Sequence, residues 1–429
     1  MTGAVAVSRF AGPAVHRILW LTAILCCLAV GFAGASDAAK PDGKGGPPKL
    51  DARAWIAIDA RTGEALAQSN AGERLPMAST TKLMTAYLAM RRLPMGKEVR
   101  ANEYNGVPGE SLMGLEDGQE VSVRDLLYGL ILLSGNDAAV TLAEAVSGNE
   151  PRFVDLMNRT AVRLGLKDTH YNNPIGLDGK SHYTSARDLA SLSRTLMEMP
   201  RFRRIASSRT AKLRSYDPPL EVETINRFLL DNSWAKGIKT GHTTKAGYVL
   251  ASDGRKRATE LIGAVIGTPT EFSRDAETVR LLDYGFSLYR KRVPVRPGRT
   301  VVEVPVKYQD EDLPLTSRRP VRIGLMKGEK ASVTIMVPNE VEGPIKKGQR
   351  IGRATVAVGG GDVIATVPLF SATAVDKPSL LDKLTGNVLL LVLVLAIIVS
   401  AILGVAALSR RRRQSRMRRR LRRVARKQR

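Results

Sequence analysis

The chain has 429 residues and a formal net charge of +25, with 44% hydrophobic and 25% charged residues. This length allows two or more packed domains, and the composition excludes an intrinsically disordered chain. Thirteen basic residues lie in residues 410–429, which contain no acid, and two lie near the start, so residues 36–409 carry only +10. The high net charge therefore belongs mainly to the C-terminal tail.

Residues 1–35 predict a cleaved export signal. An apolar run over residues 18–32 follows a basic start, and the small residues Ala33-Gly34-Ala35 come next, as signal peptidase requires. An uncleaved anchor is the alternative. The two cysteines, Cys26 and Cys27, lie inside this segment, so we expect no disulfide and no cysteine-ligated metal in the exported protein.

Residues 36–50 are rich in Pro, Gly and Lys and predict a flexible linker. Residues 51–291 then combine strand and helix patterns, which predicts an α+β domain with an antiparallel sheet and a block of helices. Ser185 is the expected N-cap of one helix, with Asp188 at its third position. In chain order, we expect a β-hairpin over 55–68, helices over 80–92, 123–134, 138–146, 152–164 and 183–198, strands over 247–252 and 260–267, and a helix over 275–289.

Residues 292–375 predict a separate all-β domain. Short alternating strands are separated there by Gly, Pro and charged turns, with almost no helical period. No motif in this region suggests chemistry, so we expect a structural role, either holding the first domain away from a membrane or contacting a partner. Residues 376–387 predict a linker.

Residues 388–408 predict a transmembrane helix. This stretch of 21 residues is interrupted only by Ser400 and Gly404, and as a helix it measures roughly 30 Å, the thickness of the hydrocarbon core. The arginine-rich residues 409–429 are expected to stay in the cytoplasm against anionic lipid headgroups, which we favour over contact with nucleic acid. We therefore expect a single-pass membrane protein whose folded domains lie on the extracytoplasmic side, in the periplasm or facing the cell wall.

The motif Ser79-Thr80-Thr81-Lys82 opens the predicted helix over 80–92. Side chains three residues apart share a helix face, so the Ser79 hydroxyl and the Lys82 amine can meet directly. This spacing places a nucleophile beside a candidate base. The motif is weak alone, because a second match occurs at Ser233-Trp234-Ala235-Lys236 and because Ser79 as a simple N-cap is the alternative.

Two further motifs accompany it. Ser134-Gly135-Asn136 follows an apolar helix, and Lys239-Thr240-Gly241 stands at the start of a predicted strand. The combination of Ser-x-x-Lys, Ser-x-Asn and Lys-Thr-Gly is the signature of penicillin-binding proteins and class A β-lactamases. Three such motifs, in that order and after an export signal, predict a serine enzyme that forms an acyl intermediate.

The sequence resembles the low-molecular-mass penicillin-binding proteins, which are D-alanyl-D-alanine carboxypeptidases of peptidase family S11. The likeness covers residues 50–375 and includes GESLMGLEDGQEVSVRDLLYGLILLSGNDAA, NPIGLDGKSHYTSARDLA, GIKTGHTTKAGY and EGPIKKGQRIG. It implies a penicillin-binding/β-lactamase-like catalytic domain, a small β-domain and a C-terminal membrane attachment. It also implies peptidoglycan stem peptides as substrates, β-lactam antibiotics as inhibitors, and no cofactor or metal.

The chain departs from this family in two places. Members often end in an amphipathic helix, whereas this chain ends in a full apolar span with an arginine-rich tail. Ile175 stands in the stretch NPIGLD, where relatives can carry a polar residue. The second departure concerns the apparatus that hydrolyses the acyl-enzyme.

The resemblance gives each motif residue a role. Ser79 attacks the carbonyl between two D-alanines and becomes the acyl ester. Lys82 takes the proton as a neutral amine, because burial and the like charge of Lys239 lower the pKa of a lysine. Ser134 relays a proton to the departing amine, and Asn136 holds the peptide group of the substrate.

The terminal carboxylate of the substrate requires a cationic slot with hydroxyl donors. Thr240 and Thr243 are expected to donate to it, and Arg274 supplies charge, with Arg227 as the alternative. Either arginine can instead be a solvated surface charge. The expected substrate-binding residues are Lys239, Thr240, Gly241, His242, Thr243 and Arg274. By resemblance, the backbone N–H groups of Ser79 and His242 are the oxyanion donors, the His242 side chain is a wall, and His170 and His182 are structural.

Three alternative functions remain open from the sequence. A β-lactamase shares the motifs but needs a glutamate that activates water, and Glu150-Pro151 is better explained as a helix start with proline in the first turn. A transpeptidase or DD-endopeptidase that acts on cross-links shares the chemistry. A non-catalytic envelope protein that binds peptidoglycan belongs to a different class, and the intact motif residues argue against it.

Overall fold

The computed structural model describes residues 46–385 and 388–427. They form two compact units: residues 46–292 together with Ile323–Gly328, here called the catalytic unit, and Val293–Arg322 together with the described residues after 328, here called the β unit. The predicted export signal over 1–35 and most of the predicted linker over 36–50 lie outside the described residues.

The catalytic unit contains an antiparallel five-stranded sheet in the order β2-β1-β9-β8-β7. Its strands are β1 (Ala54–Asp59), β2 (Ala65–Ser69), β7 (Ala235–Thr243), β8 (Gly247–Lys256) and β9 (Thr259–Thr268). The predicted hairpin is confirmed, since Trp55 pairs with Ser69 and Ile56 with Gln68. Strand β7 lies at one edge, so one side of its backbone is free of strand partners within this sheet.

Both faces of this sheet are covered by helices, which explains why every residue of β1 is buried. Ile56 and Ile58 belong to one apolar cluster, which includes residues of α5 (Ala186–Met197). Trp55 and Ala57 belong to a second cluster with residues of α8 (Glu271–Ser287). Successive side chains of a strand point to opposite faces, so β1 contributes to two cores at once.

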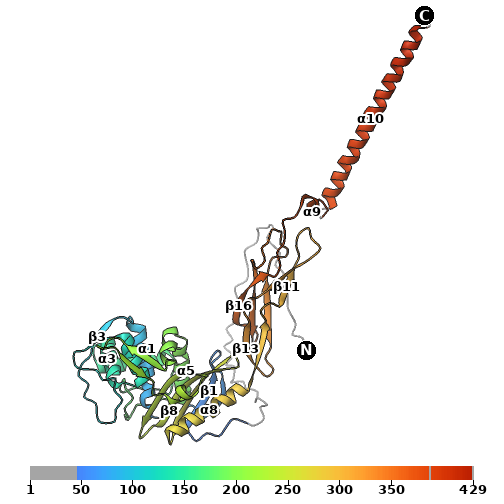
Figure 1. Cartoon of the computed structure of the whole chain (residues 1–429). Coiled ribbons are helices and arrows are strands. Elements are labelled where there is room, and N and C mark those ends of the chain that lie inside the picture. The colour runs from blue at the N-terminus through green and yellow to red at the C-terminus, as the bar shows by residue number, and fades with distance from the viewer. Residues whose placement is uncertain (1–45, 386–387, 428–429) are drawn as a thin grey trace, which may run out of the picture. The chain divides into compact units, whose positions relative to one another are not determined.

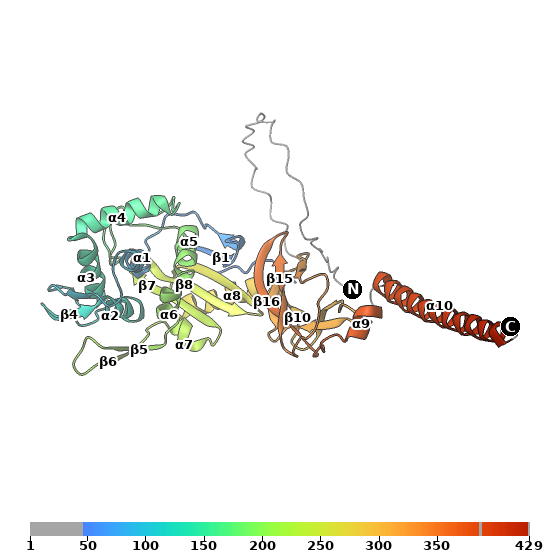
Figure 2. The ribbon, with the colours of Figure 1, turned by 90° about the horizontal axis from the view of Figure 1, so that it is seen from above.

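The helical block stands beside the sheet, as Figures 1 and 2 show. Its elements are the 3₁₀ turn η1 (Ala78–Thr81), α1 (Lys82–Arg92), α2 (Val123–Tyr128), the π-helix η2 (Gly129–Leu133), α3 (Asn136–Ser147) and α4 (Glu150–Arg163). The predicted helix over 123–134 therefore changes its winding at Gly129 and ends before Ser134. The predicted helix over 80–92 begins two residues later, because a 3₁₀ turn precedes it.

Side-chain caps set several helix boundaries. The Ser185 hydroxyl accepts a hydrogen bond from the backbone N–H of Asp188 at 3.2 Å, which confirms the predicted N-cap of α5. Helix α8 begins at Glu271 rather than near the predicted start at 275, because Thr270 and Ser273 form a reciprocal capping box.

Several short elements were not predicted. They are β3 (Glu98–Arg100), β4 (Glu120–Ser122), α6 (Pro200–Ala206), β5 (Thr210–Leu213), β6 (Leu220–Glu223) and α7 (Arg227–Asp231). Elements of this length carry little periodic signal, and tertiary packing decides whether they form.

The β unit contains a five-stranded antiparallel sheet in the order β11-β12-β16-β15-β14, and the predicted all-β architecture is confirmed. Its strands are β11 (Thr300–Val304), β12 (Leu313–Thr316), β14 (Ala331–Met336), β15 (Arg350–Val358) and β16 (Asp362–Ser371). Ala354, Val356 and Val358 are buried along β15, whereas the residues between them are only partly buried. Two more strands, β10 (Tyr289–Val295) and β13 (Val321–Met326), pair with each other.

The C-terminal part contains α9 (Leu380–Thr385) and α10 (Val388–Lys427). Within α10, Leu390–Arg418 is the one candidate membrane span among the described residues, with a mean hydropathy of 3.1 in its most apolar window and none of that window buried. Figure 1 draws α10 as one continuous helix that extends from the apolar stretch into the arginine-rich tail.

Candidate active site

Ser79 and Lys82 meet as the motif spacing predicts. Lys82 Nζ donates a hydrogen bond to Ser79 Oγ at 3.0 Å. Ser79 stands in the 3₁₀ turn η1, and Lys82 is the first residue of α1. The Ser79 side chain caps neither helix, because Met77 and Thr81 occupy the two N-cap positions. The interpretation of Ser79 as a simple N-cap is therefore wrong.

Two glycines allow other backbone segments to approach the Ser79 turn closely. A Cβ atom on Gly176 would lie 2.1 Å from the carbonyl oxygen of Ala78, and Gly176 has a φ of +101°. A Cβ atom on Gly241 would lie 3.0 Å from the backbone nitrogen of Ser79. The glycine of the Lys-Thr-Gly motif is therefore needed so that β7 can pack against the turn that contains Ser79.

A hydrogen-bonded chain supports the same turn from the other side. The Asn172 N–H donates to His182 Nδ1 at 2.9 Å, so His182 Nε2 carries the proton and donates to Thr81 Oγ1 at 2.8 Å. The Thr81 hydroxyl in turn donates to the carbonyl oxygen of Ala78, a residue with a φ of +48°. Burial lowers the pKa of His182 to about 4, so the ring is neutral and structural.

Lys82 is fully buried, which is unusual for a lysine. Its Nζ donates to the carbonyl oxygen of Ile175 at 2.7 Å as well as to Ser79. Burial lowers the pKa of Lys82 well below its ordinary value and the nearby Lys239 lowers it further, whereas Glu110 and Asp137 act in the opposite direction. Because the Ile175 contact uses its backbone carbonyl, the apolar side chain at this position does not affect it.

Lys239 lies on β7 and is also fully buried, with 1% of its surface exposed. Its Nζ donates to the carbonyl oxygen of Thr240 at 2.9 Å. Burial, with a smaller contribution from the charge of Arg274, lowers the pKa of Lys239 to about 7. Strand β7 begins at Ala235, so the Lys-Thr-Gly motif occupies the second half of the strand, not its predicted start.

Ser134 and Asn136 lie at the junction between η2 and α3. Ser134 adopts a left-handed conformation with a φ of +63°, which is strained for a residue other than glycine. Asn136 is the first residue of α3 and is 5% exposed. A Cβ atom on Gly135 would lie 2.8 Å from the carboxylate of Asp137, which explains the glycine between Ser134 and Asn136.

Asp137 and Glu110 fix the loop over 101–119 to this junction, and neither was predicted as a site residue. The Asp137 carboxylate accepts hydrogen bonds from the backbone N–H groups of Met113, Gly114 and Leu115 at 2.8–3.0 Å. Glu110 Oε2 accepts from Asn136 Nδ2 at 2.7 Å. Both acids lie in stretches that carry the family likeness, but nothing in their spacing distinguishes them from surface charges.

The residues expected to bind the substrate carboxylate differ in their exposure and in the contacts that they already make. Thr240 is 6% exposed on β7. Thr243 Oγ1 donates to Asp178 Oδ1 at 2.9 Å, so its hydroxyl already has an acceptor. The exposed His242 side chain stacks on Tyr248 with 4.1 Å between ring centroids, which suits the expected wall.

Arg274 is the better placed of the two candidate arginines. It is 2% exposed, and its charge acts on Lys239. Its guanidinium bonds to Asp275 at 2.8 Å and to Glu271 at 3.0 Å, so two acids hold it in place. Arg227 is an exposed residue at the start of the short helix α7, where the solvated-charge interpretation fits it.

Comparison with known proteins agrees with this geometry. The family model described as D-alanyl-D-alanine carboxypeptidase matches residues 42–270, and the model of the C-terminal domain of penicillin-binding protein 5 matches residues 289–377. The chain belongs to the D-alanyl-D-alanine carboxypeptidase family. The predicted family, fold class and activity as a D-alanyl-D-alanine carboxypeptidase are thereby confirmed.

Individual members of the carboxypeptidase family match most of the chain. D-alanyl-D-alanine carboxypeptidase DacF of Bacillus subtilis is 34% identical and the match covers 79% of this chain and 90% of DacF. DacA of Escherichia coli is 33% identical, and the match covers 88% of this chain and 96% of DacA. The crystal structure of penicillin-binding protein 5 from Haemophilus influenzae is 32% identical, with a TM-score of 0.55, and covers 77% of this chain and 99% of that protein.

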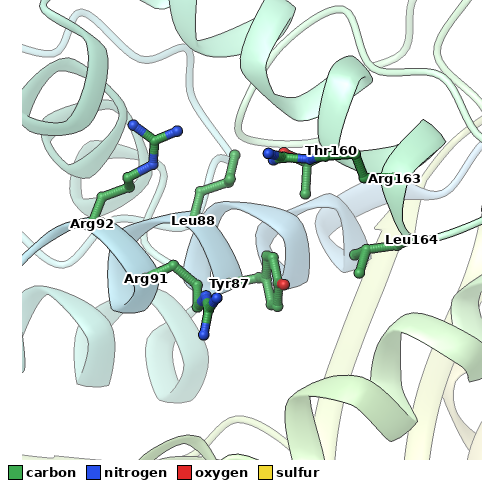
Figure 3. A pocket seen from close by; sticks show the side chains of 7 residues that line it. All are labelled: Tyr87, Leu88, Arg91, Arg92, Thr160, Arg163 and Leu164. Atoms are coloured by element: carbon green, nitrogen blue, oxygen red, sulfur yellow. The ribbon is translucent and has the colours of Figure 1, made fainter.

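A pocket of about 360 Å³ lies elsewhere on this carboxypeptidase, between α1 and α4 (Figure 3). Arg91 and Arg92 lie in the last turn of α1, and Arg163 lies in the last turn of α4. Cations at these positions stabilise the negative ends of the helix dipoles, which accounts for this cluster without a ligand. Arg91 is about 14 Å along the helix from Lys82, so the pocket is separate from the serine and lysine.

Proposed function

We propose that the chain removes the terminal D-alanine from peptidoglycan pentapeptide stems through an acyl-enzyme on Ser79. The observation that carries this proposal is the 3.0 Å hydrogen bond between Ser79 Oγ and the fully buried Lys82 Nζ. Burial favours the neutral amine, which is the form that accepts a proton.

In acylation, Ser79 Oγ attacks the carbonyl carbon between the two D-alanines while its proton passes to Lys82 Nζ. The oxyanion of the tetrahedral intermediate accepts hydrogen bonds from the backbone N–H groups of Ser79 and His242. The carbon–nitrogen bond then breaks. The departing amine takes a proton from Lys82 through the hydroxyl of Ser134, and D-alanine leaves.

In deacylation, a water molecule replaces D-alanine in the same place. Lys82 accepts a proton from the water as its oxygen attacks the ester carbonyl. The ester bond to Ser79 breaks, and Ser79 Oγ recovers its proton. The shortened stem leaves as a free acid, so one water is consumed for each D-alanine released.

Strand β7 positions the substrate. Its edge is free of strand partners within the sheet and packs against η1, so an extended peptide can lie along it by adding to the sheet. Lys239, Thr240 and Thr243 then form the slot for the terminal carboxylate, with Arg274 held nearby as a second positive charge. Asn136 holds the peptide group on the opposite, acyl side of the scissile bond.

The cellular arrangement belongs to the same proposal. The export signal over 1–35 carries the folded units out of the cytoplasm, and the apolar segment over 388–408 spans the membrane once. The tail over 409–429 then stays on the cytoplasmic side, against anionic lipid. Peptidoglycan stem peptides are the substrates, and β-lactams acylate Ser79 as inhibitors.

One assay separates this function from its alternatives. The full-length chain in detergent is incubated separately with labelled penicillin, with a pentapeptide ending in two D-alanines, and with a cross-linked dimer of stem peptides. We expect stable labelling that Ser79→Ala abolishes, together with release of free D-alanine. Rapid release of opened penicillin would instead indicate a β-lactamase, cleavage of cross-linked dimers without D-alanine release an endopeptidase, and neither labelling nor cleavage a binding protein.

A further inference from the structure

Glu110 lies at the acyl side of the proposed site and is not explained by the mechanism above. Its Oε2 accepts two hydrogen bonds, from Tyr104 Oη at 2.5 Å and from Asn136 Nδ2 at 2.7 Å. Its Oε1 receives only the Val107 N–H at 3.4 Å, which is near the outer limit for a hydrogen bond. One carboxylate oxygen is therefore saturated, and the other retains capacity to accept a donor.

Several neighbours together favour the charged form of Glu110. Burial raises the pKa of this carboxyl, but the hydrogen bonds from Tyr104, Asn136 and the Val107 N–H, together with the charge of Lys82, bring the pKa below its ordinary value. Burial, followed by the hydrogen bond to Glu110, raises the pKa of Tyr104, so the phenol remains a donor. Glu110 forms no ion pair with any side chain in the described part of the chain, and it is partly exposed.

We propose that Glu110 is a specificity-determining carboxylate that attracts a cationic amine carried by the substrate on the acyl side of the scissile bond. This inference rests on the proposed function, because it uses the position that Asn136 gives to the substrate. The Asn136 amide that holds the acyl-side peptide group is the same amide that donates to Glu110. The carboxylate is therefore next to the side chain that adjoins that peptide group.

The charge distribution of the site supports the binding of a substrate amine near Glu110. Lys239 and Arg274 provide positive charge on the side of the leaving D-alanine, and Glu110 provides negative charge on the acyl side. A substrate that is anionic at its C-terminal end and cationic on its acyl side complements both. A stem peptide whose diamino acid keeps a free side-chain amine has this charge pattern, whereas acylation of that amine removes it.

The test compares two peptides that differ in one amine. The first is Nα-acetyl-L-lysyl-D-alanyl-D-alanine with a free ε-amine, and the second carries an acetyl group on that amine. For the full-length chain we expect kcat/KM for D-alanine release to be about fivefold higher with the free amine, the size of a partly exposed ion pair. The preference should decrease at high salt, because ions screen exposed charges.

Glu110→Gln is the decisive variant. Its amide oxygen can still accept from Tyr104 and Asn136, but the charge is lost, so the ratio of the two kcat/KM values should fall to about one. Glu116→Gln is the matched control, because Glu116 is an exposed acid on the same loop and should keep the full preference. If Glu110 only fastens the loop, Glu110→Gln lowers both rates together and leaves their ratio unchanged.

Each outcome has a clear meaning. Equal kcat/KM values for the two peptides with the unmodified chain would overturn the inference without any variant, while leaving the carboxypeptidase function intact. A preference that survives in Glu110→Gln would overturn it as well. Absence of D-alanine release from both peptides would instead remove the proposed function on which the inference rests.

Discussion

The two folded units differ in whether they bury charged side chains. In the catalytic unit, Lys82, Lys239, Asp137 and Arg274 are all at most 4% exposed. Among the described residues of the β unit, the buried polar side chains are two serines, and none of the buried residues is charged. Burying a charge is costly unless it is paired or changes its protonation state, so the buried charges mark the unit that performs chemistry.

The largest expected effect comes from changing Lys82, which is fully buried and hydrogen-bonded to Ser79. Lys82→Arg should lower the rate of Ser79 acylation by about a thousandfold or more, because a guanidinium does not release its proton and cannot act as base. Labelled penicillin measures this rate directly. Lys256→Arg, at a salt bridge with Asp283 away from the site, should leave the rate unchanged. Normal acylation in Lys82→Arg would show that buried charge does not identify the base.

A second prediction concerns the close packing around the nucleophile. Gly176→Ala should destabilise the catalytic unit by about 4 kcal/mol, because the new methyl group meets the Ala78 carbonyl and the backbone conformation is left-handed. Urea unfolding followed by tryptophan fluorescence measures this loss. Gly96→Ala is the control, since no atom lies within 4 Å of its added Cβ. Equal stabilities of the two variants would contradict the proposed contact.

A third prediction tests the β unit as a purely structural region. Leu369→Ala, at a fully buried position of β16, should cost about 3 kcal/mol of stability, because it leaves a cavity. The described residues of the unit include no buried charge, so D-alanine release below the unfolding transition should stay at its original rate. A fall in kcat for D-alanine release from a soluble pentapeptide, with the fold intact, would mean that the β unit contributes to catalysis.

The smallest expected effect is a pH dependence that reports both buried lysines. Acylation needs neutral Lys82, which faces Lys239, Glu110 and Asp137, so kcat/KM should fall about tenfold per pH unit below the pKa of Lys82. Carboxylate binding needs charged Lys239, whose pKa of about 7 reflects burial and Arg274, so kcat/KM should also fall as the pH rises above that value. Lys239→Arg should remove the alkaline decrease, because arginine keeps its charge. If kcat/KM of this variant still decreases at alkaline pH, the decrease is caused by the titration of a group other than Lys239.

Local sequence signals predicted a large part of the fold. The hairpin of β1 and β2, the Ser185 cap and the alternating strands of the β unit follow from periodicity and capping residues. The change from α-helix to π-helix at Gly129 could not be predicted in this way. A continuous α-helix over 123–134 would have the same apolar pattern. The motif spacing also predicted that Ser79 and Lys82 meet, but no motif predicted the acids Glu110 and Asp137.

The sequence by itself determined that the Ser79 hydroxyl and the Lys82 amine meet, since the two residues are separated by one helical turn and their meeting is a local event. Only the tertiary structure decided the burial of Lys82 and the direction in which its pKa shifts. The pKa of Lys82 depends on burial and on Lys239, and the orientation of Asn136 depends on Glu110. These contacts join residues that are far apart in the sequence. A local sequence pattern does not predict that such residues lie close together in the folded chain.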